Sequence, residues 1–345
     1  SRRRHTRSLC DWSSDVCSSD LIRPCLTETI CRDLLKQGRK IGAIIATMGT
    51  TDAFGVDDLE ALHGVRDRLV AEFNLDYIPH LHADAVIGWA WSVFNDYDFE
   101  SNPLGFRRRT VRALAIVRHR MRHLGLADSI GVDFHKTGFT PYISSLFLLR
   151  DSSDLKLIAR TKDAMPYLFQ SGEYHPGQYT LETSRSASGA MAALANLLLF
   201  GKNGLRALLG HVVSMADALR EQLESHEATH VLNSGNHGPV TLFRVYPPGT
   251  DTFKIPELER TDASYRDLLR RHNQYNRRIF EIIQAEALQG RGVVISLTDC
   301  YRESDYGEPT VALKSYILSP FAEEEAVQFV LESIWRAREI GRAHV

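Results

Sequence analysis

The sequence predicts an α/β protein with a larger N-terminal domain and a smaller C-terminal one. Its 345 residues, 43% of them hydrophobic, are enough for more than one buried core. In the first half of the chain, short β-branched runs alternate with segments of helical period, which is typical of a mostly parallel sheet. From residue 204 a long helix leads into a separate set of strands and helices. We therefore expect a large domain over residues 21–203 and a small α/β domain, with its linking helix, over residues 204–338.

The two ends of the chain do not fit this scheme. Residues 1–20 have neither helical nor strand period, and they lack the apolar segment of a signal peptide. Residues 339–345 look like the same kind of segment at the other end. We interpret both as non-native, adapter-derived sequence, and we therefore expect the natural protein to continue beyond both boundaries.

Charge and cysteine content argue against several kinds of function. The chain has 41 Lys and Arg against 43 Asp and Glu, so its net charge of -2 gives no electrostatic reason to expect nucleic acid or an anionic membrane as partner. No apolar run approaches the roughly 18 residues of a membrane span. The five cysteines match no zinc-binding spacing, and a chain of this size does not need disulfides to fold. We expect a cytoplasmic protein without a metal site.

The first two strands should build one parallel unit. A buried strand over residues 41–47 ends at Gly49-Thr50-Thr51, and Asp57 starts an amphipathic helix. The next strand, over residues 77–83, runs into Asp84. Because a right-handed parallel crossover presents equivalent strand ends at one sheet edge, we expect Gly49 to Thr51 and Asp84 to emerge together.

Lys136 lies at the predicted mouth of a further strand. Residues 129–133 form a β-branched run, and a breaker zone follows at residues 138–141. Such strand ends are where α/β sheets place their chemistry. Lys136 could be a surface ammonium, or, in a partly desolvated cleft, its amine could condense with an aldehyde as a Schiff base. Asp84 could likewise be a helix cap or half of a structural ion pair, because an unpaired buried carboxylate is costly.

Between Asp84 and Lys136 lies an arginine-rich helical segment. Its seven arginines could suggest a polyanion site, but the near-zero net charge favours a solvated face or subunit contact paired with acidic neighbours. The arginines are Arg107, Arg108, Arg109, Arg112, Arg118, Arg120 and Arg122.

The remaining elements follow from period and breakers. After Lys136 we expect another buried strand over residues 144–150, and a loop near the site over residues 165–183. Arg185 then lies among small residues that open a helix; these permit close helix packing, whereas Arg185 could bind a phosphate or a carboxylate. The other expected elements are helices over residues 27–37, 204–224, 262–287 and 323–338, strands over residues 240–246, 293–297 and 311–318, and a surface loop over residues 247–261.

Several motifs together resemble one enzyme family. Asp133-x-His135-Lys136 followed by Pro141-Tyr142 is similar to the pyridoxal-phosphate lysine segment of the group II amino-acid decarboxylases. Further motifs of the resemblance, which covers roughly residues 25–337, are Gly49-Thr50-Thr51, His82-x-Asp84-Ala85, Ala127-Asp128-Ser129 and Ser184-Arg185-Ser186. The resemblance implies the aspartate-aminotransferase type of fold (fold type I of the pyridoxal-phosphate enzymes). This fold has a mostly parallel, seven-stranded large domain and a small C-terminal α/β domain, usually in a homodimer.

The resemblance also implies an activity, the decarboxylation of an L-amino acid to its amine and carbon dioxide. Lys136 would hold pyridoxal 5'-phosphate as a Schiff base, and Asp84 would keep the ring nitrogen protonated. His135 would contact the cofactor phosphate or the substrate, and Tyr142 is a candidate pocket residue or proton donor. Two further residues are implied at the cofactor, Thr51 along the ring and His82 from the His-x-Asp motif.

The sequence also departs from the family pattern. Val86, Ile87 and Trp89 replace the small residues that usually follow the aspartate, which leaves the shape of the substrate pocket open. The family's ring-stacking histidine and phosphate loop are not found in residues 1–40, so we hypothesise that this chain binds the cofactor weakly or not at all. The alternatives are another fold-type I reaction, an aminotransferase or lyase, and an inactive dimerising fragment. The Lys136 segment hints at an aromatic amino acid as substrate.

Overall fold

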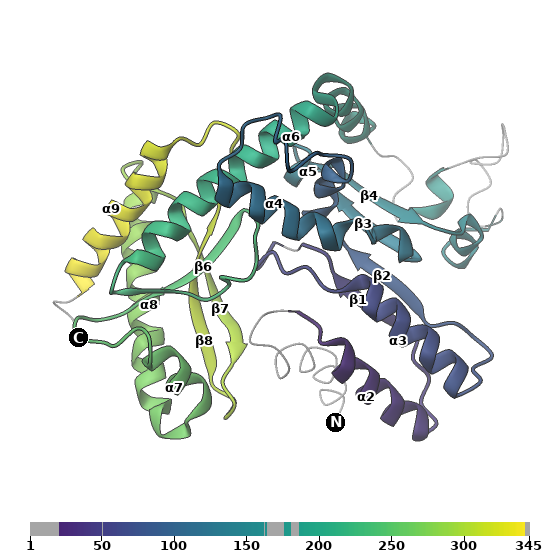
Figure 1. Ribbon diagram of the computed structural model, residues 1–345, viewed down its shortest axis with the longest axis horizontal. Coiled ribbons are helices and arrows are strands. Elements are labelled where there is room, and N and C mark those ends of the chain that lie inside the picture. The colour runs from purple at the N-terminus through teal and green to yellow at the C-terminus, as the bar shows by residue number, and fades with distance from the viewer. Residues whose placement is uncertain (1–20, 50, 162, 164–175, 181–185, 342–345) are drawn as a thin grey trace.

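The computed structural model describes residues 21–49, 51–161, 163, 176–180 and 186–341 (Figure 1). Two four-stranded sheets organise these residues. The first contains β1 (Ala43–Thr47), β2 (His80–Asp84), β3 (Ser129–Asp133) and β4 (Ser145–Leu149), in that order. The second contains β5 (Thr229–Val231), β6 (Val240–Val245), β8 (Pro309–Tyr316) and β7 (Ser296–Glu303), in that order. The main helices are α2 (Pro24–Lys36), α3 (Leu59–Glu72), α4 (Arg108–Met121), α5 (Phe134–Thr137), α6 (Ser188–Ser225), α7 (Ile255–Thr261), α8 (Arg266–Leu288) and α9 (Glu324–Gly341).

The first sheet confirms the predicted parallel unit. Strands β1, β2 and β3 are parallel, and Thr47 at the end of β1 pairs with Asp84 at the end of β2. The sheet has four strands in the described residues, whereas the family resemblance implied seven, because this part of the chain supplies only four strand-forming runs that pair in it.

Strand β4 corrects one expectation. It was predicted to be buried, but it is the antiparallel edge strand of the sheet, and Leu146, Phe147 and Leu148 are all exposed. An apolar run of this length predicts a strand without indicating how many neighbours cover it.

Among the described residues, helices cover one face of the first sheet. Ile44 and Ala46 on β1, with Leu81 and Ala83 on β2, share one buried core with side chains of α3 and α4. Because side chains alternate along a strand, the residues between them lie on the opposite face. There Ile45 is 60% exposed, and the side chains at the ends of β1 and β2 are half-buried.

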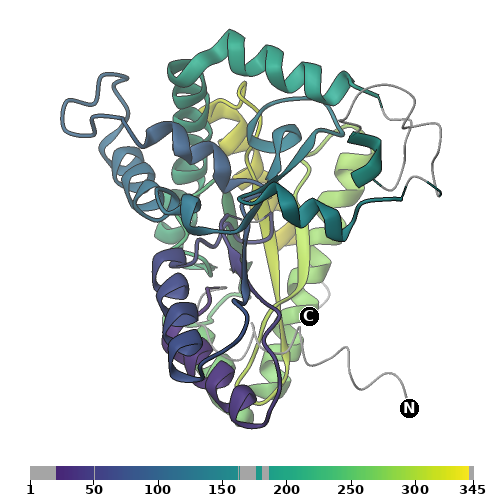
Figure 2. The same cartoon turned by 90° about the vertical axis from the view of Figure 1, so that its right-hand side faces the viewer.

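Helix α6 joins the two halves of the molecule. Two helices were expected here, and the structure has one element with non-helical backbone at Gly201, where φ is 55° and ψ is -166°. Figure 2 shows that the segments before and after Gly201 run in different directions. Five side chains of the second segment enter two cores: Leu209 and Val213 enter the first, and Met215, Leu219 and Leu223 enter the core of the second sheet.

Two further boundaries differ from the prediction. Asp58, not Asp57, caps α3, because its carboxylate accepts the N–H of Ala61 at 3.1 Å. The predicted loop over residues 247–261 contains α7, in which Pro256 lies in the first turn, where proline favours a helix start.

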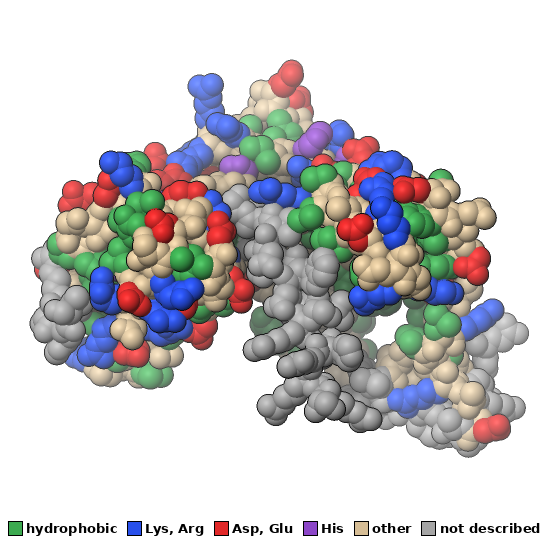
Figure 3. All heavy atoms as spheres, turned by 90° about the horizontal axis from the view of Figure 1, so that it is seen from below, with side chains coloured by type: hydrophobic (Ala, Val, Ile, Leu, Met, Phe, Trp, Pro, Cys, Tyr) green, Lys and Arg blue, Asp and Glu red, His purple; other side chains and the backbone are tan. Residues whose placement is uncertain are grey.

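Three of the seven arginines of the α4 region pair with acidic side chains, so the prediction is confirmed for these three. Arg109 lies 2.9 Å from Glu224, Arg120 lies 2.5 Å from Asp58, and Arg107 pairs with Glu324. On the face drawn in Figure 3, basic and acidic side chains are interspersed. None of the helices in the described ranges is long and apolar enough to cross a bilayer.

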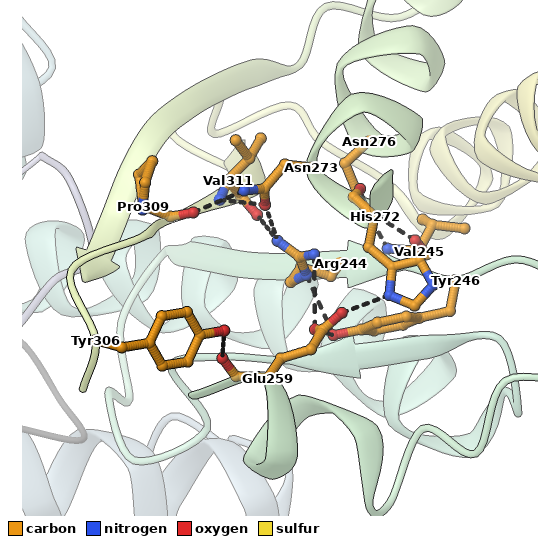
Figure 4. Close-up of polar contacts among 10 residues, drawn as sticks. All are labelled: Arg244, Val245, Tyr246, Glu259, His272, Asn273, Asn276, Tyr306, Pro309 and Val311. Carbon is orange, nitrogen blue, oxygen red and sulfur yellow. Dashed lines mark hydrogen bonds and ion pairs between the residues drawn. The ribbon is translucent and has the colours of Figure 1, made fainter. Parts of the chain in front are cut away.

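A buried polar network fixes the second sheet (Figure 4). Arg244 on β6 donates to Asn273 at 2.7 Å and lies 3.8 Å from the Glu259 carboxylate, which bonds His272 at 2.5 Å. The hydroxyl of Tyr246 lies 3.2 Å from Arg244 Nε and 3.4 Å from Glu259. All of these side chains are buried, so their charges and dipoles stabilise one another in place of water.

Candidate active site

Lys136 lies where the sequence predicts, in the single turn α5 that follows β3. Its side chain is 12% exposed, and its Nζ lies 2.8 Å from Asp133 Oδ2. Lys136 is therefore a largely buried ammonium at a strand end, held by a carboxylate three residues earlier.

Asp133 is itself held from two sides. Its Oδ1 accepts a hydrogen bond from the hydroxyl of Ser145 on β4 at 2.6 Å. Burial alone would raise the pKa of Asp133, but the hydrogen bonds from Lys136 and Ser145 bring this pKa below its ordinary value. Asp133 is therefore an anion that orients the Lys136 amine. It belongs to the Asp-x-His-Lys motif, but it was not among the predicted site residues.

Two side chains anchor the Lys136 turn to the segment after β2. The hydroxyl of Thr137 donates to the carbonyl oxygen of Ile87 at 2.7 Å, and both groups are buried. The indole N–H of Trp89 donates to the carbonyl oxygen of Asp133 at 3.2 Å, and its ring packs against Phe134 with centroids 4.8 Å apart. Ile87 and Trp89, two of the residues that depart from the family pattern, thus hold the Lys136 turn in place.

His135 connects the lysine turn to the start of β4. Its Nδ1 lies 2.9 Å from the carbonyl oxygen of Ser144, its Nε2 lies 3.6 Å from Asp133, and its ring lies 4.1 Å from that of Tyr142. The Tyr142 side chain is 76% exposed. The contacts predicted for His135 and Tyr142 with cofactor or substrate stay predictions.

Asp84 ends β2, and its carboxylate has no bonded partner in the part of the chain that the structure describes. It is half-buried, and no described residue donates a hydrogen bond to its carboxylate or forms an ion pair with it. Neither structural explanation, a helix cap or an ion pair, therefore holds among these residues. Its neighbour His82 instead bonds Ser129 Oγ at 2.7 Å, and burial lowers the pKa of His82.

The strand ends that carry these groups touch one another. The carbonyl oxygen of Gly49 accepts the N–H groups of Ile87 at 3.0 Å and Gly88 at 3.3 Å. A Cβ on Gly88 would lie 2.1 Å from the carbonyl oxygen of Met48, so only glycine allows this approach. Sequence reasoning missed Gly88, although its place after a strand end was a signal. Thr51 follows this contact and is half-buried.

Asp84 and Asp133, the carboxylate that holds the Lys136 amine, lie on the same face of the sheet. Asp84 pairs with Gly131, and Asp133 lies two residues further along β3, so both carboxylates are on one face and are offset by about 7 Å along the strands. Since the Lys136 amine lies 2.8 Å from Asp133, an amine and a second carboxylate, that of Asp84, lie at neighbouring strand ends of this face. Thr50, Arg185 and most of the predicted loop over residues 165–183 lie outside the described residues. Within the described residues, no group of three side chains could hold a metal ion.

Comparison with known proteins points to one family. The model of the pyridoxal-dependent decarboxylase conserved domain matches residues 114–246, which include Lys136. L-tyrosine decarboxylase of Enterococcus faecium is 27% identical over 57% of this chain and 34% of that protein. Aspartate 1-decarboxylase of Aliivibrio fischeri is 23% identical over 84% of this chain and 46% of that protein. The chain thus spans less than half the length of both relatives.

Solved structures show the same fold. The crystal structure of mouse CSAD in its apo form superimposes with a TM-score of 0.66 at 15% identity, over 92% of this chain and 56% of that chain. Oryza sativa TDC with PLP and tryptamine gives a TM-score of 0.62 at 18% identity, over 94% of this chain and 53% of that chain. The fold is therefore that of the fold-type I pyridoxal-phosphate decarboxylases. Residues 114–246, which contain the lysine segment, thus match the domain of the pyridoxal-dependent decarboxylases, and the chain is similar to the amino-acid decarboxylases named above.

Proposed function

We propose that this chain supplies the lysine and the ring-facing carboxylate of a pyridoxal-phosphate site that converts an L-amino acid to its amine and carbon dioxide. The observation that carries the proposal is that Asp133, which holds the Lys136 amine, and Asp84, whose carboxylate has no partner among the described residues, lie on one face at neighbouring strand ends. Large and small domains over residues 21–203 and 204–338 belong to the same proposal.

Each residue has a task in this proposal. When bound, pyridoxal phosphate supplies an aldehyde for covalent attachment and a ring that takes up the electrons left at Cα as carbon dioxide departs. Lys136 would hold it through its amine, which Asp133 orients. Asp84 would face the ring nitrogen and favour its protonated state by charge pairing.

The other predicted site residues have supporting tasks. Thr51 would line the ring, and His82 would hold the Asp84 strand to β3 through Ser129. His135 would contact the phosphate or the substrate, and Tyr142 would border the pocket or donate a proton.

Substrate and assembly are parts of the same proposal. Both relatives described above are decarboxylases of amino acids, one of tyrosine and one of aspartate, so the class of substrate is supported and its side chain is not. A homodimer is supported by exposed apolar side chains in the first segment of α6, among them Met191, Leu194 and Leu198.

A second candidate is a chain that keeps both groups but holds the cofactor weakly. The observation that favours it is the open sheet face beside Asp84, on which Ile45 is 60% and Phe147 56% exposed. A cofactor lying there would keep contact with water, which weakens its charge pairing with the protein.

The visible absorption spectrum with added pyridoxal phosphate tests the proposal. We expect the band of lysine-bound cofactor in the unsubstituted chain, made permanent by borohydride, and its loss in Lys136→Ala. Lys202→Ala is the matched control, because Lys202 is an exposed lysine paired with Asp96 far along the chain. If the unsubstituted chain and Lys136→Ala both give the spectrum of free cofactor, the proposal is wrong for this chain. If the cofactor binds, release of carbon dioxide rather than a keto acid separates decarboxylation from transamination.

A further inference from the structure

Strand β8 turns one face toward the first sheet. Along this face Ala312 packs with Ala53, and Lys314 Nζ lies 3.1 Å from Asp52. Both partners belong to the loop that follows Gly49 at the end of β1. Because side chains alternate along a strand, the next residue on this face is Tyr316.

Tyr316 reaches the core of the first sheet. It pairs with Val240 and packs against the same hydrophobic cluster as Met48 and Ile87, the residues that flank Gly49 and Gly88 at the strand ends. Burial, and then the charges of Tyr142 and Asp133, raise the pKa of its phenol. Ile87 of this cluster also accepts the hydrogen bond of Thr137, so Tyr316 and the Lys136 turn border the same core.

The Tyr316 hydroxyl is buried and has no hydrogen-bond partner among the described residues. Such a group is unfavourable, because it has lost its bonds to water without replacement. Most buried polar groups in native proteins are paired with protein or water, so an unpaired one beside a candidate site indicates a partner that arrives with a ligand.

We propose that Tyr316 is a ligand-contacting residue of the Lys136 site, and that its hydroxyl donates a hydrogen bond to an oxygen acceptor of the molecules bound there. This inference rests on the proposed function. The acceptor belongs either to pyridoxal phosphate or to the carboxylate of the amino acid, and the two sources give different results in one experiment.

The experiment compares Tyr316→Phe with Tyr246→Phe. Tyr246 is a buried tyrosine of the same sheet region whose hydroxyl is paired with Arg244 and Glu259. Without ligand, Tyr316→Phe should keep or raise the melting temperature, because it removes only an unpaired hydroxyl, whereas Tyr246→Phe should lower it. Thermal unfolding measures both.

Binding is then measured from the absorption spectrum. Titration with pyridoxal phosphate gives the cofactor Kd, and titration of the loaded protein with L-tyrosine or L-aspartate gives amino-acid binding. If the Tyr316 hydroxyl bonds the cofactor, the cofactor Kd should rise about tenfold in Tyr316→Phe, equivalent to about 1.4 kcal/mol. If the Tyr316 hydroxyl bonds the amino acid instead, only the amino-acid Kd should rise, by the same factor. Tyr246→Phe should leave both unchanged.

Three results would overturn the inference. If Tyr316→Phe lowers the melting temperature as Tyr246→Phe does, the hydroxyl is structural. If both affinities are unchanged while Lys136 binds the cofactor, Tyr316 is not a ligand contact and the proposed function stands. If the unsubstituted chain binds no cofactor at Lys136, the inference and the proposed function fail together.

Discussion

At the scale of single residues, the site depends on side chains that fix the Lys136 turn. Lys136 and Asp84 could be predicted because each stands at the end of a strand in a recognisable motif. Thr137 and Trp89 could not, because their hydrogen bonds join residues 50 and 44 positions apart. Local sequence carries no information on such contacts until the strands are in place.

Thr137→Val tests this positioning role. Valine keeps the shape of threonine but leaves the buried carbonyl oxygen of Ile87 without its donor, so we expect a loss of about 1–3 kcal/mol in the free energy of unfolding. Because the Lys136 turn loses an anchor, the cofactor Kd should also rise. Thr137→Ser keeps the hydroxyl and is the matched control. Equal stability and equal Kd in the two variants would contradict the role, with urea unfolding and absorption as the measurements.

At the scale of elements, hydrophobic period predicted which segments are helices and strands. It placed β1, β2 and β3 with the helices between them, and their parallel pairing followed from the crossover argument. It could not predict that β4 is an exposed, antiparallel edge, because exposure depends on what packs against a strand. The part of the site that the sequence predicts therefore lies at the ends of β1, β2 and β3. The rest depends on contacts between elements.

A second prediction concerns the close approach of the ends of β1 and β2 at Gly88. Alanine at Gly88 would place its Cβ against the backbone of Met48, so the end of β1 must move away from the segment after Asp84. We expect Gly88→Ala to lower the free energy of unfolding by about 1–3 kcal/mol and to weaken cofactor binding. Gly125→Ala is the control, because nothing lies within 4 Å of its Cβ position. A Gly88→Ala variant as stable as this control would show that the contact is loose.

At the scale of the whole molecule, Asp57 links the stability of the fold to pH. Its carboxylate accepts the N–H groups of Ile22 at 2.7 Å and Thr47 at 2.6 Å, so it joins the segment before α2 to β1. Burial raises its pKa from 3.8 to about 7, although the two backbone donors act in the opposite direction. The folded state therefore binds this proton more tightly than the unfolded state.

The sign of the pH dependence follows from this proton. Between about pH 4 and pH 7 the folded state holds more of it, so the contribution of Asp57 to stability falls as the pH rises, by up to about 1.4 kcal/mol per pH unit. Asp57→Asn removes the titration, and the stability difference between the two proteins should change across this window and level off above it. Urea unfolding at a series of pH values measures it. A constant difference would mean that Asp57 is ionised throughout.

Helix α6 affects how the molecule unfolds. One continuous segment after Gly201 places Leu209 and Val213 in the first core, and Met215, Leu219 and Leu223 in the second. Because the same helical segment contributes side chains to both cores, one core cannot unfold without disturbing the helix that packs in the other. The two halves should therefore behave as a single cooperative folding unit, and a ligand that binds the folded lysine site stabilises the distant sheet as well.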